Sequence, residues 1–385
     1  MKIKDFLKIF GIIAFFTVVS FSGCTDSATP KDPSPVTAIM KKYVSDVVGH
    51  FKGRIYSWDV LNEVFPDGGY TSSDWKKEMR KENPWFKAIG SDFVYEGFLA
   101  ARLADPDAIL YYNDYNLDNS SKATMVRNMV KAVNDKYLAS NDKPDGEAAG
   151  RLLIEGIGMQ SHHNTGVSAN SIKATLNLFK PLGVKISISE LDVLGQSYND
   201  FAKVGQGTNK HGSTTVTAQG LQTQASLYGQ YMALFIEYKD IIERVSLWGI
   251  TDDQSWRSAG LPLLFDPSGK AKAAYYSFTS NTGSGEDIMS LTPMKTQFGA
   301  NFMMGNIFNP SDVSGSSVTN TRLTRHFNVL TAENNMKPSY ISPSQGTYNF
   351  TTADNMVNAA RASGFQVVGH TLLWHSQNAS WMNNL

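Results

Sequence analysis

The strongest constraint on the fold is an alternation of strand-like and helix-like segments along most of the chain. Short runs rich in β-branched and apolar residues predict strands at 55–60, 108–113, 153–160, 184–190, 244–250, 298–304, 327–332 and 366–373. Apolar residues at helical spacing predict helices at 37–51, 91–103, 122–138, 168–178, 217–238, 271–279, 317–325 and 352–362. Such alternation builds parallel sheets, and eight strands close a TIM (β/α)8 barrel. We therefore predict an α/β fold of this type.

Composition agrees with a single large globular core. The chain has 385 residues, of which 42% are hydrophobic and 18% charged, and a barrel needs about 250 residues or more. Lys and Arg together number 35 and so do Asp and Glu, so no net field favours nucleic acid. His162 and His163 have no third ligand at a recognisable spacing, and no P-loop or GxGxxG pattern occurs. We predict no metal, no cofactor and no nucleic-acid partner.

The first 24 residues have the pattern of a targeting segment. Lys2, Lys4 and Lys8 precede an apolar stretch at 9–19, and small residues then lead to Cys24, the only cysteine. A bacterial lipoprotein signal over 1–24, with Cys24 as the lipid attachment site, is the interpretation we prefer. An ordinary cleaved signal peptide and a short membrane anchor are the alternatives. Residues 25–36 are rich in Pro, Ser, Thr and Asp and predict a tether.

Two predicted strands end on acidic residues. Residues 56–63 form a β-rich run that stops on Asn62 and Glu63, and residues 184–192 carry a second run into Glu190 and Asp192. A single glutamate at a strand end is usually a solvated surface charge. Because active sites of parallel barrels form at the carboxyl ends of the strands, two such ends predict a carboxylate pair.

Five motifs carry a resemblance to a known family. The motifs are Trp58-Asp59-Val60-Leu61-Asn62-Glu63, Gly158-Met159-Gln160-Ser161-His162, Ser189-Glu190-Leu191-Asp192, Thr331-Ala332-Glu333-Asn334-Asn335-Met336-Lys337-Pro338 and Gly369-His370-Thr371-Leu372-Leu373-Trp374-His375-Ser376-Gln377. With these motifs the chain resembles glycoside hydrolase family 10, the endo-β-1,4-xylanases, over nearly everything after the tether.

The order of these motifs departs from the family. Segments like 298–381 open the family's domain, whereas here they follow segments like 39–279. The chain therefore resembles a circular permutant in which five family C-terminal strands come first, three family N-terminal strands come last, and a linker near 280–296 joins the old ends. Residues 37–385 would form one catalytic barrel. A rearranged or misassembled gene, or a loop once interrupted by a module, would give the same order.

The resemblance implies roles for the catalytic residues. Glu63 matches the family's general acid/base and Glu190 its nucleophile, so we expect burial or the charge of Glu190 to raise the pKa of Glu63. Asn62 matches the amide that binds the sugar 2-hydroxyl. His162 matches a residue that bonds the nucleophile, with Asp192 behind it. His162 as a core histidine and Asp192 as a loop cap are the alternatives.

The resemblance also implies a binding cleft. Trp248 and Trp256 match aromatic walls, although Trp248 could be core packing. Six further residues match those that bind the glycone sugars in the family, namely Glu333, Asn334, Lys337, His370, Trp374 and Gln377. A lysine and a glutamate among them could be only a rim ion pair. Gln160 is expected beside the acid/base, Arg257 beside Trp256, and Tyr115 on the aglycone side.

Together these features predict a retaining endo-β-1,4-xylanase acting on xylan or xylo-oligosaccharides. A non-catalytic xylan-binding barrel and a mixed β-1,4-glycanase are the alternatives. We expect a monomer that is secreted or displayed on a bacterial cell surface, with membrane contact only through an N-terminal lipid anchor.

Overall fold

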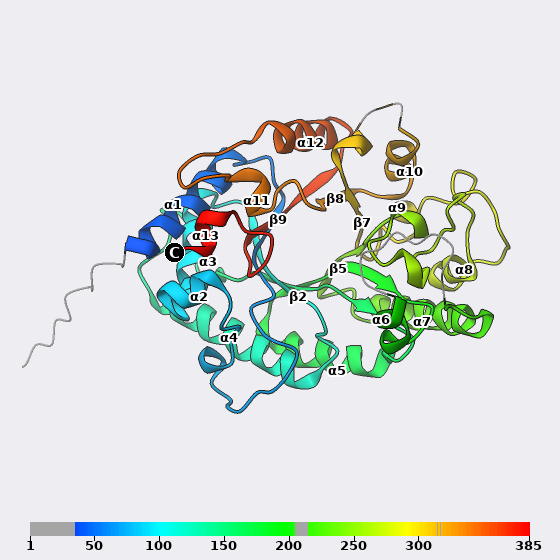
Figure 1. Cartoon of the computed structure of the whole chain (residues 1–385), viewed down its shortest axis with the longest axis horizontal. Helices are drawn as coiled ribbons and strands as arrows, with labels where there is room; N and C mark the ends of the chain where they lie inside the picture. Colours follow the sequence, from blue (N-terminus) through cyan, green and yellow to red (C-terminus); the bar gives the residue numbers. More distant parts are fainter. Residues whose placement is uncertain (1–34, 205–214, 314, 316) are drawn as a thin grey trace, which may run out of the picture. The chain divides into compact units, whose positions relative to one another are not determined.

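Eight parallel strands close into a barrel in the computed structural model of this chain, which describes residues 35–204, 215–313, 315 and 317–385 (Figure 1). The ring runs in the order β1, β2, β3, β5, β6, β7, β8, β9 and back to β1. The strands are β1 (Ser57–Asn62), β2 (Ile109–Asp114), β3 (Gly156–Met159), β5 (Lys185–Val193), β6 (Ile242–Leu247), β7 (Met303–Phe308), β8 (Val329–Ala332) and β9 (Gln366–Leu373). A two-residue strand, β4 (His162–His163), pairs with the far end of β5. The predicted TIM barrel is thus confirmed.

Helices surround the strands on the outside of the barrel (Figure 1). Those predicted from the sequence are α1 (Pro35–His50), α3 (Asp92–Ala104), α4 (Ser120–Ala139), α5 (Ala169–Phe179), α7 (Ala218–Glu237), α8 (Ala273–Thr279), α10 (Val318–His326) and α12 (Thr351–Ala362). Short helices not predicted are α2 (Pro84–Ile89), α6 (Tyr198–Val204), α9 (Met294–Gln297), α11 (Pro338–Ile341) and α13 (Ser380–Asn383). Side-chain caps fix the N-termini of several helices. At the start of α4, for example, the Asn119 side chain accepts hydrogen bonds from the backbone N–H groups of Ser121 and Lys122.

The N-terminal segments predicted above lie mostly outside the described residues. Residues 1–34, which include Cys24 and most of the expected tether, are not described, and α1 already begins at Pro35. Within the described ranges, no helix has both the length and the apolar character that crossing a membrane requires.

One predicted strand is partly wrong, and the segment predicted as a linker packs against the barrel. The strand expected at 298–304 is wrong in its first part, because Phe298 is the C-cap of α9 and the strand begins only at Met303. Phe298 and Phe302 stack with ring centroids 6.0 Å apart, a spacing of four residues that suits a turn of helix rather than a strand. The expected linker near 280–296 is docked on the barrel, since Ile288 is fully buried and its amide donates to Gly269.

The barrel closes where the first strand meets the last. Trp58 pairs with Gly369 and Asp59 with His370 along the parallel β1–β9 ladder. The Thr371 hydroxyl donates to the Asp59 carbonyl at 2.8 Å, and the His370 ring lies 2.9 Å from the Asp59 carboxylate. Trp58 is fully buried against Gly369, where a Cβ atom would lie 2.2 Å from the indole. This seam therefore requires glycine at position 369.

We expect Gly369→Ala to destabilise the fold because its methyl group must displace the Trp58 ring and open the seam. The loss in free energy of unfolding should be roughly 1 to 3 kcal/mol, measured by urea denaturation. Gly49→Ala is the matched control, because Gly49 lies in α1 with open space around its Cβ position. That substitution should leave stability unchanged or raise it by up to about 1 kcal/mol. Equal effects of the two substitutions would contradict the role given to Gly369.

Candidate active site

A cleft of about 1010 Å³ opens at the carboxyl ends of the strands. Its lining includes fifteen of the sixteen cleft residues predicted from the sequence, and those fifteen are Asn62, Glu63, Tyr115, Gln160, His162, Glu190, Trp248, Trp256, Arg257, Glu333, Asn334, Lys337, His370, Trp374 and Gln377. The remaining one, Asp192, is fully buried directly behind His162. Segments that are far apart in the sequence therefore meet in one site.

Glu63 stands just past the end of β1 and is surrounded by hydrogen-bond donors. Its backbone has a φ of 55°, which turns the chain out of the strand. One carboxylate oxygen accepts from Gln160 at 3.0 Å, and the other lies 3.0 Å from the Trp374 indole nitrogen and 2.9 Å from His375. The carboxylate is thus held on both of its oxygens.

These donors reverse the expected direction of the Glu63 pKa. Burial raises the pKa, as predicted, but the hydrogen bonds from His375, Gln160 and Trp374 and the charge of His375 outweigh burial and lower it to about 2. The expectation of a raised pKa is therefore wrong for this arrangement of donors, in which Glu63 is ionised at neutral pH.

Glu190 lies near the end of β5 and is buried. One of its oxygens accepts from the Asn113 amide at 2.7 Å, and the other lies 3.1 Å from His162. Asn113 comes from β2 and was not predicted as a site residue. It ends the strand predicted at 108–113 and pairs with Asn62 in the structure, so its place at a strand end was the available signal.

Behind Glu190, opposite charges alternate through the protein. His162 lies 3.0 Å from Asp192, and Asp192 pairs with Arg257, which is 3% exposed. Burial lowers the pKa of His162, but the two carboxylates outweigh it and raise the pKa to about 9. Likewise, burial raises the pKa of Asp192, but Arg257 and His162 hold it below its usual range. Glu190 therefore faces a protonated imidazole.

Three side-chain amides connect the two carboxylates. The Asn62 amide lies 3.0 Å from the Asn113 amide nitrogen and 3.2 Å from that of Gln160. Asn113 in turn reaches Glu190, and Gln160 reaches Glu63. Because amides carry both donors and acceptors, they can hold two negative groups in one pocket without adding charge.

Aromatic rings line one wall of the cleft. Trp248 is 6% exposed and lies edge-on to His162 and His370, with centroid distances of 6.1 and 5.8 Å. Trp256 is 41% exposed, and its ring lies 5.2 Å from that of His162. The exposed ring of Trp256 offers a flat apolar face to a ligand, whereas Trp248 is mainly packed.

The loops after β8 and β9 supply a second group of polar side chains. Lys337 is buried, donates to Asn334 at 2.9 Å and lies 5.2 Å from the Trp374 ring. Burial lowers its pKa, against the opposing effect of Glu190, Glu333 and Glu63. The cation thus faces both catalytic candidates rather than forming a rim ion pair. His370 is fixed by Asp59, and Gln377 is exposed at the edge.

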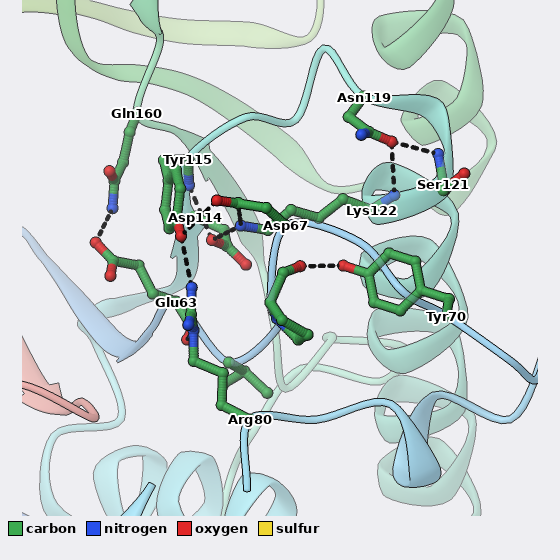
Figure 2. A network of polar contacts seen from close by, with 12 residues as sticks. Glu63, Asp67, Tyr70, Arg80, Asp114, Tyr115, Asn119, Ser121, Lys122 and Gln160 are labelled. Carbon is green, nitrogen blue, oxygen red and sulfur yellow. Dashed lines mark hydrogen bonds and ion pairs between the residues drawn. The ribbon is translucent and has the colours of Figure 1, made fainter. Parts of the chain in front are cut away.

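The opposite side of Glu63 is held by a polar network (Figure 2). Arg80 donates to the Glu63 carbonyl at 3.0 Å and to the Tyr115 hydroxyl at 2.6 Å. The fully buried Lys122 lies 3.6 Å from the Tyr115 ring centroid, 2.8 Å from Asp114 and 3.2 Å from the exposed Asp67. This network fixes the loop on which Glu63 stands and presents Tyr115 to the cleft.

His375 and Arg80 are further contacts of Glu63 that were not predicted. His375 follows Trp374 within a motif singled out from the sequence, so its position was visible although its contact was not. Arg80 had no such signal, because it reaches Glu63 across 17 residues of irregular chain. No group of three or more His, Cys, Asp or Glu among the described residues is arranged to hold a metal ion.

Two carboxylates at the ends of barrel strands, in one cleft with an exposed aromatic face, define the class of glycoside hydrolases. The sequence profile of glycosyl hydrolase family 10 matches residues 15–281 and 293–385. The chain belongs to this family.

Individual relatives agree. The chain is 34% identical over 245 residues to an endo-1,4-beta-xylanase of Geobacillus stearothermophilus, covering 62% of this chain and 66% of that protein. It is 33% identical over 253 residues to endo-1,4-beta-xylanase A of Thermotoga neapolitana, covering 64% of this chain and 21% of that protein. A crystal structure of a GH10 xylanase with a bacterial Ig-like domain, from termite gut, is 56% identical with a TM-score of 0.60. It matches over 63% of this chain and 52% of its own. The chain thus spans less than two thirds of the length of these relatives.

The raised pKa of His162 predicts how stability depends on pH. The folded state binds this proton more tightly than the unfolded state, so the stabilisation is complete below about pH 6.5 and is lost as the pH rises to about 9. We expect the free energy of unfolding to fall by roughly 3 kcal/mol across this window, measured by urea titration at each pH. His162→Gln should remove the slope.

His163→Gln is the control for this measurement. Burial lowers the pKa of His163 to about 3, so His163 is neutral throughout the window. Its substitution should leave the slope above pH 6.5 intact, whatever it does to absolute stability. A slope that survives His162→Gln would show that another group causes it.

Proposed function

We propose that this protein is a retaining endo-1,4-β-xylanase that hydrolyses internal bonds of xylan or xylo-oligosaccharides and acts as a monomer. The observation that carries the proposal is the pair Glu63 and Glu190 in one cleft, each held by a different set of partners. Relatives named endo-1,4-beta-xylanase support the substrate class.

In the first step, Glu190 attacks the anomeric carbon and forms a glycosyl-enzyme bond while the bond to the leaving sugar's oxygen breaks. Glu63 gives its proton to that oxygen. In the second step, Glu63 takes a proton from water, the water oxygen attacks the same carbon, and Glu190 is released. Two inversions retain the anomeric configuration.

The surroundings of Glu190 suit a nucleophile. The Glu190 carboxylate accepts from the Asn113 amide on one oxygen and lies against His162 on the other. Asp192, which pairs with Arg257, holds the far side of the His162 ring and raises its pKa. Glu190 is thus fixed in position by partners on both of its oxygens.

Glu63 must change its protonation during the cycle. With these donors in place Glu63 is ionised, which is the state that the second step requires. All three donors line the cleft, and Gln160 and Trp374 are candidates to bind sugar. If substrate draws them away, the pKa of Glu63 rises, because burial still opposes the charge. Substrate binding would thus favour the protonated form of Glu63, which the first step requires.

We expect the protein to release reducing sugar from xylan, and Glu63→Ala and Glu190→Ala each to lower kcat at least about a hundredfold. Proton NMR of the first products should show retained β-configuration. No release by the unaltered protein would leave a non-catalytic xylan-binding barrel. Equal rates on xylan and on β-1,4-glucan would instead indicate a mixed glycanase.

We also propose that the family's motifs stand here in circularly permuted order. The two-piece profile match and the β1–β9 seam support this arrangement. Residues near 280–296, docked on the barrel, would then join the family's original ends.

We further propose that the protein is exported and held by a lipid on Cys24 at a bacterial cell surface, with residues after Cys24 as the tether. We expect the unaltered protein to enter the detergent phase in Triton X-114 partitioning, because an acyl chain adds about 0.8 kcal/mol of membrane affinity per buried CH₂ group. Cys24→Ser should move it to the aqueous phase. A cleaved, unlipidated signal would place both proteins in the aqueous phase.

A further inference from the structure

A second cavity of about 420 Å³ lies beside the cleft, between the loops that follow β6 and β7. We call it the side pocket. It shares only Trp256 and Glu333 with the cleft, which therefore form the wall between the two. A continuing polymer backbone would follow the cleft itself. A separate space off its side fits a substituent on the backbone.

Hydrogen bonds fix the side pocket at both ends. The Gln254 amide donates to the Thr319 hydroxyl at 3.2 Å and so connects the β6 loop to the start of α10. At the end nearest the cleft, the Asn309 amide donates to Glu333 at 2.6 Å. The pocket is thus a built feature that joins the wall of the cleft.

The lining of the side pocket is polar and acidic. Most of its residues carry hydroxyl, amide or carboxylate groups, and its carboxylates are those of Asp253, Asp312 and Glu333. None of the described residues that line it is Lys or Arg. Asp253 has a buried carboxylate oxygen with no hydrogen-bond donor among the described residues, so its negative charge is not neutralised by a neighbour. Such a charge beside the pocket repels a ligand carboxylate.

We propose that the side pocket binds a neutral pentosyl branch, of the arabinosyl type, carried by a xylan sugar on the Glu333 side of the cleaved bond. The proposal rests on the proposed function and adds a preference for one kind of branched xylan. Sugar hydroxyls can bond to the hydroxyl, amide and carboxylate groups of the lining, and the volume accommodates one pentose. A uronosyl branch would bring a carboxylate next to three others, with no Lys or Arg among the described lining residues to pair with it.

The test compares three substrates with the full chain. They are linear xylohexaose and matched oligosaccharides that carry either one arabinosyl or one uronosyl branch on the glycone side. We expect the arabinosyl substrate to be cleaved with the branch retained near the new reducing end. Its kcat/KM should be at least about tenfold above that of the uronosyl substrate.

Thr319→Phe fills the side pocket and should lower the ratio of kcat/KM for arabinosyl over linear substrate about tenfold. Val318→Phe is the matched control, because Val318 is the preceding residue of α10, is 65% exposed and does not line the pocket. It should leave the ratio unchanged. In a second arm, Asp253→Asn should raise the relative rate on the uronosyl substrate roughly threefold.

The proposal fails if Thr319→Phe lowers the ratio no more than Val318→Phe, or if the uronosyl substrate is cleaved as well as the arabinosyl one. Failure of the proposed function looks different, because linear xylohexaose would then not be cleaved at all. In that case the test uses ratios of dissociation constants in place of ratios of kcat/KM. These constants are measured by titration calorimetry for the same three oligosaccharides. A lower dissociation constant for the arabinosyl compound than for the linear one, with the difference lost in Thr319→Phe, supports the proposal. Equal dissociation constants for the two compounds contradict it.

Discussion

The pairing of β1 with β9 is the interaction on which the site depends. It joins strands about as far apart in the sequence as any two in the barrel, and it closes the ring. Parallel strands end at the same edge, so the residues after both strands meet there. This is why Trp374 and His375 reach the carboxylate of Glu63. Without the seam, Glu63 would lose two of its donors and the opposite wall of its cleft.

The two carboxylates differ because of what lies behind them. Glu63 is held by single donors from several loops, and all three of them, Gln160, Trp374 and His375, also line the cleft. Glu190 is supported by a series of buried charges that ends at Arg257. A ligand can withdraw donors from Glu63, whereas it cannot reach Asp192 or displace the imidazole's second bond. The partners of Glu63 can therefore change during the reaction, while the surroundings of Glu190 stay fixed.

Much of this arrangement could be predicted from the sequence. Alternating patterns gave eight strands and the longer helices, and strand ends with Asn62-Glu63 and Glu190 pointed to the site. The short helices were missed because four to seven residues show too little periodicity to detect. Phe298 and Phe302 suggested a strand because an apolar run of that length is ambiguous between strand and helix.

Contacts were harder to predict than positions. Asn113 bonds Glu190 from another strand, and Arg80 supports Glu63 from an irregular segment, so neither pairing has a local signal. The lowered pKa of Glu63 could not be predicted for the same reason. Burial alone has a predictable sign, but the number of donors that converge on a carboxylate depends on how distant loops pack.

The barrel also places the catalytic carboxylates and the proposed branch-binding pocket on different segments of the chain. The carboxylates stand at the end of β1 and on β5, while most of the side pocket is built from the loops after β6 and β7. The two spaces share only the lining residues Trp256, from the loop after β6, and Glu333, which follows β8. Loops of a barrel can vary while its strands stay fixed. Substitutions in the side pocket can therefore change which branches the cleft tolerates and leave the geometry of Glu63 and Glu190 intact. Substitutions along the β1–β9 seam have no such freedom, because that seam holds the cleft and the catalytic pair in the same register.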